Sequence, residues 1–166
     1  MIETQTLTRS RTYSWTDPAV NAAELGRRSG LDLLQAMGRG EIPPPPIMHT
    51  LGMEGIEVTD GGVVFSLYPQ EYHYNPLGTV HGGVLATMLD TAAACSVHST
   101  LAAGERYTSV DLTVKFLRAV TAESGRLRAE GSVIQRGRRT ALAQAQLFDA
   151  QGRLVAHATS TCMIFS

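Results

Sequence analysis

The stretch that decides the fold is residues 74–101, YNPLGTVHGGVLATMLDTAAACSVHSTL. It begins with turn-forming residues, passes through His81-Gly82-Gly83, and becomes a run of small and apolar residues that carries one acid, Asp90. A helix so poor in charge is apolar nearly all round, so we expect other structure to wrap it. A buried carboxylate costs several kcal/mol unless it is paired, hydrogen-bonded or protonated. Asp90 is therefore the first candidate for a functional residue.

The segments on either side of this helix predict strands. Residues 48–69 read as a hairpin around the turn at 60–62, and residues 107–117 alternate with a period of two. Three more candidate strands follow at 125–135, 140–148 and 154–165, the last two joined by a turn at 149–152. One helix must cover one face of such a sheet. The sequence therefore predicts an α+β fold in which a curved antiparallel sheet wraps around a central helix.

The N-terminal quarter has a different pattern. Residues 1 to about 20 are polar and show no period, and apolar residues then recur at helical spacing to Met37, with Gly30 splitting the run. The four prolines of residues 43–46 forbid a helix and favour an extended polyproline spacer. We therefore divide the chain into an N-terminal arm and peripheral helix, residues 1–42, and a main domain, residues 43–166.

Composition narrows the class of partner. The 166 residues fit a single core, and a net charge of -1 with 17% charged residues offers no basic field for nucleic acid. No membrane span or secretory signal is evident, so we expect a cytoplasmic protein whose partner is a small molecule or another protein. Cys95 and Cys162 are too few for a disulfide framework and are expected to be reduced core residues.

The order of elements and the motif N-x-x-G-x-x-H-G-G, followed by L-D, resemble the hotdog-fold thioesterases, specifically the PaaI-like group of acyl-coenzyme A thioesterases associated with phenylacetate degradation. The likeness runs from about Pro43 to the C-terminus. It implies hydrolysis of an acyl- or aryl-coenzyme A thioester to a free acid and coenzyme A, with no metal and no cofactor. It also implies a homodimer or a homotetramer built as a dimer of dimers.

Asp90 has two interpretations. A desolvated carboxylate can act as nucleophile or general base on a thioester, and it can also be a structural residue that bridges buried groups. Gly82 and Gly83 lie where the helix begins, so their free N–H groups suit an oxyanion, although a glycine pair can also simply allow a tight turn. In the family that the sequence resembles, the amide matching Gly82 polarises the thioester carbonyl. We expect Gly83 to contribute to substrate binding.

Spacing gives a prediction that is independent of the family. Gly82 and Asp90 are eight residues apart, which is about 12 Å along a helix axis. One carbonyl group cannot contact both of them in a single chain. If both act, Asp90 comes from a neighbouring subunit and the site lies across a two-fold interface.

The remaining candidates come from the resemblance and from local chemistry. Asn75 and His81 match motif positions that orient the thioester and the turn, although each is also a common structural residue. Ser109 matches a position whose hydroxyl orients the attacking water, with Thr108 as the fallback. Arginines around Gly137 suit the phosphates of coenzyme A, although a solvated basic turn is the commoner case. This cluster comprises Arg136, Arg138 and Arg139, to which Lys115 and Arg118 could add.

Two other functions stay open. One is a non-catalytic hotdog module that binds acyl-coenzyme A or a lipid-like acid, and the other is a hotdog hydratase. The hydratase is disfavoured because its Asp/His catalytic pairing is not evident. The histidines are scattered without ligand spacing, so no metal site is expected. The glycine amide together with the acid favours the thioesterase over a binder.

Overall fold

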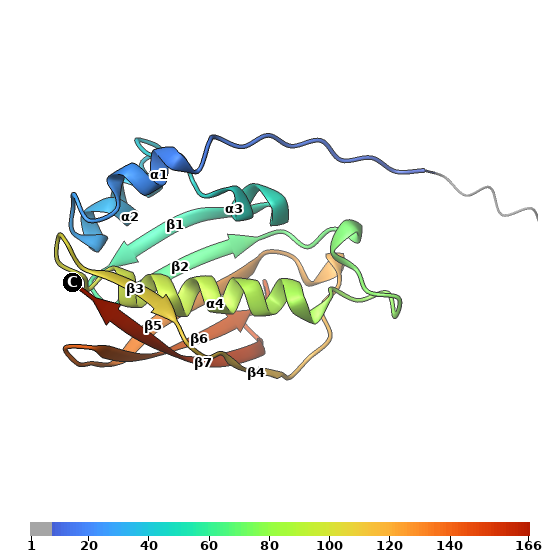
Figure 1. Ribbon diagram of the computed structural model, residues 1–166. Helices are drawn as coiled ribbons and strands as arrows, with labels where there is room; N and C mark the ends of the chain where they lie inside the picture. Colours follow the sequence, from blue (N-terminus) through green and yellow to red (C-terminus); the bar gives the residue numbers. More distant parts are fainter. Residues whose placement is uncertain (1–7) are drawn as a thin grey trace, which may run out of the picture.

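The computed structural model describes residues 8–166, which form an α+β fold with one antiparallel sheet and one long helix lying across it (Figure 1). Within these residues the sheet has seven strands in the order β1-β2-β5-β6-β7-β3, and β4 also pairs with β7. Every strand pair is antiparallel. The strands are β1 (Met53–Thr59), β2 (Gly62–Leu67), β3 (Arg106–Ser109), β4 (Thr113–Phe116), β5 (Leu127–Arg136), β6 (Thr140–Phe148) and β7 (Leu154–Phe165). The predicted fold class is confirmed.

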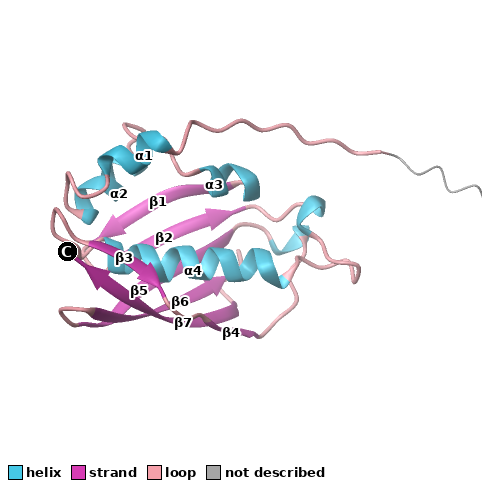
Figure 2. Cartoon of the chain, in the orientation of Figure 1, coloured by secondary structure: helices cyan, strands magenta, loops and turns pink. Residues whose placement is uncertain are grey.

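The long helix is α4 (Gly82–His98), which packs against β2, β5, β6 and β7 (Figure 2). Its sheet-facing side is fully buried and supplies much of the core. Its other side, which includes Ala86, Thr87 and Asp90, is only half-buried. The expectation that this helix is wrapped all round is therefore met on one side only within a single chain. The buried residues are Leu85, Met88, Leu89, Ala92, Ala93, Ala94, Ser96 and Val97.

Gly131 lets α4 lie directly on the sheet. A Cβ atom at this position of β5 would lie 2.0 Å from the Ala92 carbonyl oxygen and 3.0 Å from the Ala93 nitrogen. These are backbone atoms of a buried helix and cannot rotate away. The absence of a side chain at Gly131 thus fixes the distance between helix and sheet, and with it the position of Asp90.

The predicted strand 107–117 is two strands. At the break between β3 and β4, the Asp111 carboxylate accepts the Thr161 N–H (2.9 Å) and the Asp111 carbonyl accepts the Ser160 hydroxyl (2.8 Å). The alternation of half-buried and exposed residues shifts by one residue at this break. Tyr107 and Ser109, at odd positions, are half-buried before it, whereas Leu112 and Val114, at even positions, are half-buried after it and Val110 is exposed. The prediction of one continuous strand with a single alternation over residues 107–117 was therefore wrong.

The N-terminal helices are α1 (Ala19–Glu24), α2 (Gly30–Gly38) and α3 (Pro46–Leu51), with α2 and α3 packed beside β1 (Figure 1). The break before Gly30 was predicted. The helix α3 was not, because Pro46 occupies its first position, where a missing N–H is no loss. The expectation that residues 43–46 exclude a helix was thus wrong for Pro46, and strand structure starts at Met53 rather than Met48. None of the described helices is long and apolar enough to cross a membrane. The first seven residues of the predicted arm lie outside the described part.

Candidate active site

The N-terminus of α4 presents one free amide. His81 caps the helix: its Nδ1 accepts the Gly83 N–H (2.8 Å), and its carbonyl accepts the Val84 N–H (2.9 Å). Among the described residues the Gly82 N–H has no partner, and it lies at the positive end of the helix dipole. Of the two predicted glycine amides, Gly82 can therefore receive an oxyanion, whereas the Gly83 amide is occupied by His81. Since His81 Nδ1 is an acceptor here, the neutral imidazole carries its proton on Nε2.

Asn75 organises the loop that leads into this helix. Its Oδ1 accepts the N–H groups of Leu77 (2.9 Å) and Thr79 (3.3 Å), and its Nδ2 donates to the Thr79 hydroxyl (3.0 Å). Gly78 supports the same turn with a φ of 77°. The structure therefore shows Asn75 in a turn-forming role, close to the helix start that the same loop delivers.

A cleft of about 350 Å³ opens beside Gly82. The Phe116 ring forms one side, since a Cβ added to Gly82 would lie 3.1 Å from it. Arg118 also lines this cleft. Sequence reasoning missed Phe116. This exposed residue ends β4, and a strand pattern does not show that it lies over Gly82, which is far away in the sequence. The other lining residues are Asn75, Thr79, Val80, Leu85, Leu117, Ala119 and Val120.

Asp90 and Ser109 meet on the half-buried side of α4. Burial raises the pKa of the Asp90 carboxyl above its usual range, and a hydrogen bond with Ser109 acts in the opposite direction. Ser109 faces the helix because alternate residues of β3 point to opposite sides, and for the same reason Thr108 is exposed. The structure thus brings Ser109 to Asp90 and leaves Thr108 away from it.

Two thiols lie beside this pair. Ser109 Oγ is 4.0 Å from the Cys162 Sγ, and burial raises the pKa of Cys162. Burial also raises the pKa of Cys95 to about 12. Both cysteines are free and both thiols are protonated near neutral pH, so neither supplies a thiolate nucleophile.

The two candidate groups, Gly82 and Asp90, lie apart on one helix. Both lie on α4, eight residues apart, so their separation along the axis is about 12 Å. Gly82 opens into the cleft with Phe116, whereas the Asp90 carboxyl lies near the Ser109 hydroxyl of β3. A single thioester carbonyl cannot contact both groups of the same chain.

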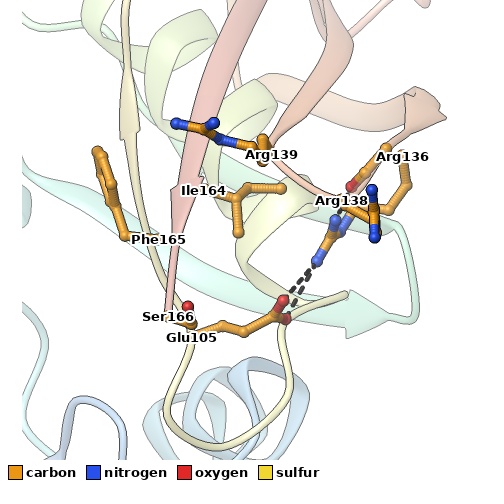
Figure 3. Close-up of a pocket in the computed structure, with 8 residues that line it drawn as sticks. Glu105, Arg136, Arg138, Arg139, Ile164, Phe165 and Ser166 are labelled. Carbon is orange, nitrogen blue, oxygen red and sulfur yellow. Dashed lines mark hydrogen bonds and ion pairs between the residues drawn. The ribbon is translucent and has the colours of Figure 1, made fainter.

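The arginine cluster is only partly as expected. Arg136 is bound by Glu105 (3.0 and 3.1 Å), which neutralises it. Arg138 and Arg139 are exposed and line an open cleft of about 890 Å³, in which Figure 3 shows their guanidinium groups directed away from one another. The Arg139 carbonyl accepts the Ile164 N–H on β7 (2.8 Å), and Ile164 is two residues from Cys162. Arg138 and Arg139 therefore lie toward the end of β7 that pairs with Ser109, the neighbour of Asp90.

Arg118 does not join this cluster. Its N–H donates to the carbonyl of Val155, nine residues along β7 from Ile164, which is about 30 Å in a strand. Arg118 therefore belongs to the Gly82 cleft. The expectation that Arg118 extends the Arg138 and Arg139 patch was wrong within one chain. Lys115 lies opposite His157, also remote from that patch. Within residues 8–166 no group of three or more His, Cys, Asp or Glu side chains is arranged to hold a metal ion.

Comparisons with known proteins agree with this arrangement. The thioesterase superfamily model matches residues 77–156. The phenylacetic acid degradation-related protein of Ralstonia eutropha JMP134 is 36% identical with a TM-score of 0.71, over 78% of this chain and 98% of that one. The Escherichia coli K12 medium/long-chain acyl-CoA thioesterase YigI is 28% identical over 79% of this chain and 93% of its own. The E. coli PaaI protein, at 24% identity, has a TM-score of 0.71 over 83% of this chain and 96% of its own and shares the fold.

The chain therefore belongs to the thioesterase superfamily. Within it, the protein is a hotdog-fold thioester hydrolase of the PaaI-like group.

Proposed function

We propose that this protein hydrolyses an acyl- or aryl-coenzyme A thioester to a free acid and coenzyme A, at a site that combines Gly82 of one chain with Asp90 of another. The observation that carries the proposal is on α4. This helix begins with an unpartnered amide and holds, eight residues later, a half-buried carboxylate whose neighbour on β3 is Ser109. The similarity to acyl-coenzyme A thioesterases supports the substrate class.

In the proposed reaction the Gly82 N–H donates to the thioester oxygen, and the helix dipole stabilises the negative charge that develops there. Asp90 of the partner chain either takes a proton from an attacking water or attacks the carbonyl carbon itself. When water attacks, the carbon–sulfur bond then breaks to give the free acid, and coenzyme A leaves as the thiolate and takes up the proton held by Asp90. When Asp90 attacks, the same bond breaks and leaves an acyl–Asp90 anhydride, which a water molecule hydrolyses to the free acid and the Asp90 carboxylate. Ser109 holds the Asp90 carboxylate and orients the water. His81 fixes the helix start, so that the Gly83 amide is occupied and only the Gly82 amide faces the substrate.

The arginines suit the coenzyme from two sides. Arg118 lines the Gly82 cleft, whereas Arg138 and Arg139 lie toward the Asp90 half-site. When two chains meet to join these half-sites, cations from both chains approach the same coenzyme phosphates. We propose Arg138 and Arg139 as phosphate contacts on this basis, and a homodimer or a dimer of dimers as the active assembly.

A hydrolysis screen tests the proposal. Purified protein is incubated with acetyl-, hexanoyl-, decanoyl-, palmitoyl-, phenylacetyl- and benzoyl-coenzyme A, and released thiol is measured. We expect turnover of at least one thioester and its loss in Asp90→Asn. Tight binding of acyl-coenzyme A without thiol release from any of them would favour the alternative, a non-catalytic binding module.

A further inference from the structure

A second cleft opens at the start of α4, on the other side from the Gly82 cleft. It measures about 440 Å³ and contains no carboxylate among its lining residues. Its wall joins segments that are far apart in the sequence: Arg11 of the N-terminal arm lines it together with residues of α3 and α4. The remaining lining residues are Thr50, Leu51, Tyr72, His73, Tyr74, His81, Gly83, Val84 and Thr87.

Arg11 is fixed in this wall by several contacts. Its guanidinium donates to the carbonyls of Thr50 (2.6 Å) and His49 (2.7 Å), in the last turn of α3 where carbonyl groups lack helical partners. It also lies over the rings of Tyr72, at 4.3 Å, and Tyr13, at 4.8 Å. The arm, defined here as residues 8–17, is thus held against the mouth of the cleft by a cation placed between two rings.

His73 makes the adjacent wall rigid. It is buried, its Nδ1 accepts the Gln70 N–H (3.0 Å), and its Nε2 donates to the Leu51 carbonyl (2.8 Å). Burial lowers its pKa, so the ring is neutral near pH 7 and adds no charge to the cleft. The lining also presents two tyrosine rings and two aliphatic side chains, whereas its Arg11 guanidinium and its Thr50 and Thr87 hydroxyls donate to backbone carbonyls. An uncharged, apolar ligand fits the tyrosine and aliphatic part of this lining.

Consecutive residues at the start of α4 line the two clefts: Gly82 lines one, and His81 and Gly83 line the other. A thioester carbonyl carbon is planar, so the sulfur and the acyl carbon leave it about 120° apart when the oxygen is held at Gly82. With the carbonyl at Gly82, as proposed, each cleft is beside one end of the thioester and can take one of these two branches. The Gly82 cleft holds Arg118, which has no ion-pair partner among the described residues, and suits the phosphate-bearing coenzyme.

We infer that the second cleft, which Arg11 and Tyr72 line, holds the acyl group, and that the N-terminal arm, through Arg11, forms its outer wall and selects large acyl groups. This rests on the proposed function for the position of the carbonyl. It assigns a specificity role to a segment that lies ahead of the matched family region, which starts at residue 77. An acetyl group has only one methyl beyond its carbonyl and therefore offers the wall little surface to contact.

The test compares large and small acyl groups in Arg11→Ala and Tyr72→Ala. We expect kcat/KM for phenylacetyl- and octanoyl-coenzyme A to fall about tenfold in each, with acetyl-coenzyme A within about twofold of wild type. Arg27→Ala is the matched control, because Arg27 is an exposed arginine whose partner is Glu24. It should change neither value. An equal loss on all three substrates, or no loss on any, would overturn the inference.

Calorimetry separates this inference from the proposed function. In an Asp90→Asn background, in which turnover should be about 100-fold slower or more, the affinity advantage of octanoyl- over acetyl-coenzyme A should shrink when Arg11→Ala is added. Arg118→Ala should instead weaken coenzyme A and both thioesters by the same factor. If wild type hydrolyses nothing but Arg11→Ala still removes the acyl preference, the function fails and the cleft assignment holds. An acyl preference that follows Arg118 instead would reverse the assignment and refute it.

Discussion

Replacing Gly82 by proline removes the proposed oxyanion donor and little else. Gly82 is the first residue of α4. Proline is favoured at this position, because an N–H here has no partner within the helix and its loss costs no helical hydrogen bond. The preceding His81 has φ -61° and ψ 135°, the extended conformation that a residue before proline adopts. The ring's Cβ would lie 3.1 Å from Phe116, whose side chain is 54% exposed and free to shift. The fold should therefore tolerate the change.

The effect on catalysis should be large. Loss of one oxyanion donor lowers kcat by about 10²- to 10³-fold, or about 2.7–4 kcal/mol of transition-state stabilisation. Gly82→Ala is the matched control, because it adds the same Cβ and keeps the N–H. We expect it to retain most of kcat and to raise KM a few-fold as the cleft narrows.

Steady-state thiol release and thermal melting on the same preparations give the answer. The melting temperature of Gly82→Pro should stay within about 4 °C of wild type, which corresponds to about 1 kcal/mol at this chain length. Equal losses of kcat in the proline and alanine variants would mean that the cleft's shape matters and the amide does not. Normal kcat in Gly82→Pro would refute the oxyanion role.

Three further outcomes are expected. Asp90→Asn should lower kcat about 100-fold or more. In the wild type, burial raises the pKa of Asp90 and the base must be ionised to act, so the acidic limb of the kcat/KM profile should lie above the usual carboxyl range. A raised acid pKa favours the folded state at low pH and loses that contribution as pH rises, so Asp90→Asn should not lower the melting temperature at pH 7, and a marked decrease with near-normal turnover would make Asp90 structural. Arg138→Ala with Arg139→Ala should raise KM for coenzyme A thioesters and spare short thioester mimics without the nucleotide; equal effects on both would make the pair structural. Gly131→Ala should destabilise the fold by about 3 kcal/mol or more in urea unfolding, since its Cβ meets the Ala92 backbone, and a wild-type midpoint would contradict that packing.

Local sequence chemistry accounts for the parts of the fold that were predicted. The period of two, the turns at glycine and the charge-poor run around Asp90 act over a few residues, so they identify strands and the central helix. The break at Asp111 and the helix that begins at Pro46 were missed for a different reason. Each depends on a specific contact or on one position of a helix, which a hydrophobic pattern does not encode.

The candidate site divides in the same way. Gly82 and Asp90 could be found because their spacing on one helix is fixed by helix geometry. That Ser109 rather than Thr108 faces Asp90 required the register of β3 against β7. The positions of Phe116 and Arg118 beside Gly82 result from tertiary packing, and no local signal marks them. The division of the chain at residues 42 and 43 stays a prediction.

The central claim is that one site takes Gly82 from one chain and Asp90 from another, and subunit complementation tests it. Gly82→Pro and Asp90→Asn chains carrying different tags are co-expressed, and the mixed assembly is purified through both tags. A two-chain site predicts that each mixed dimer has one intact site and one doubly altered site, and therefore about half of wild-type activity. Mixed dimers no more active than the two parent variants would place both groups in sites within single chains and contradict the claim.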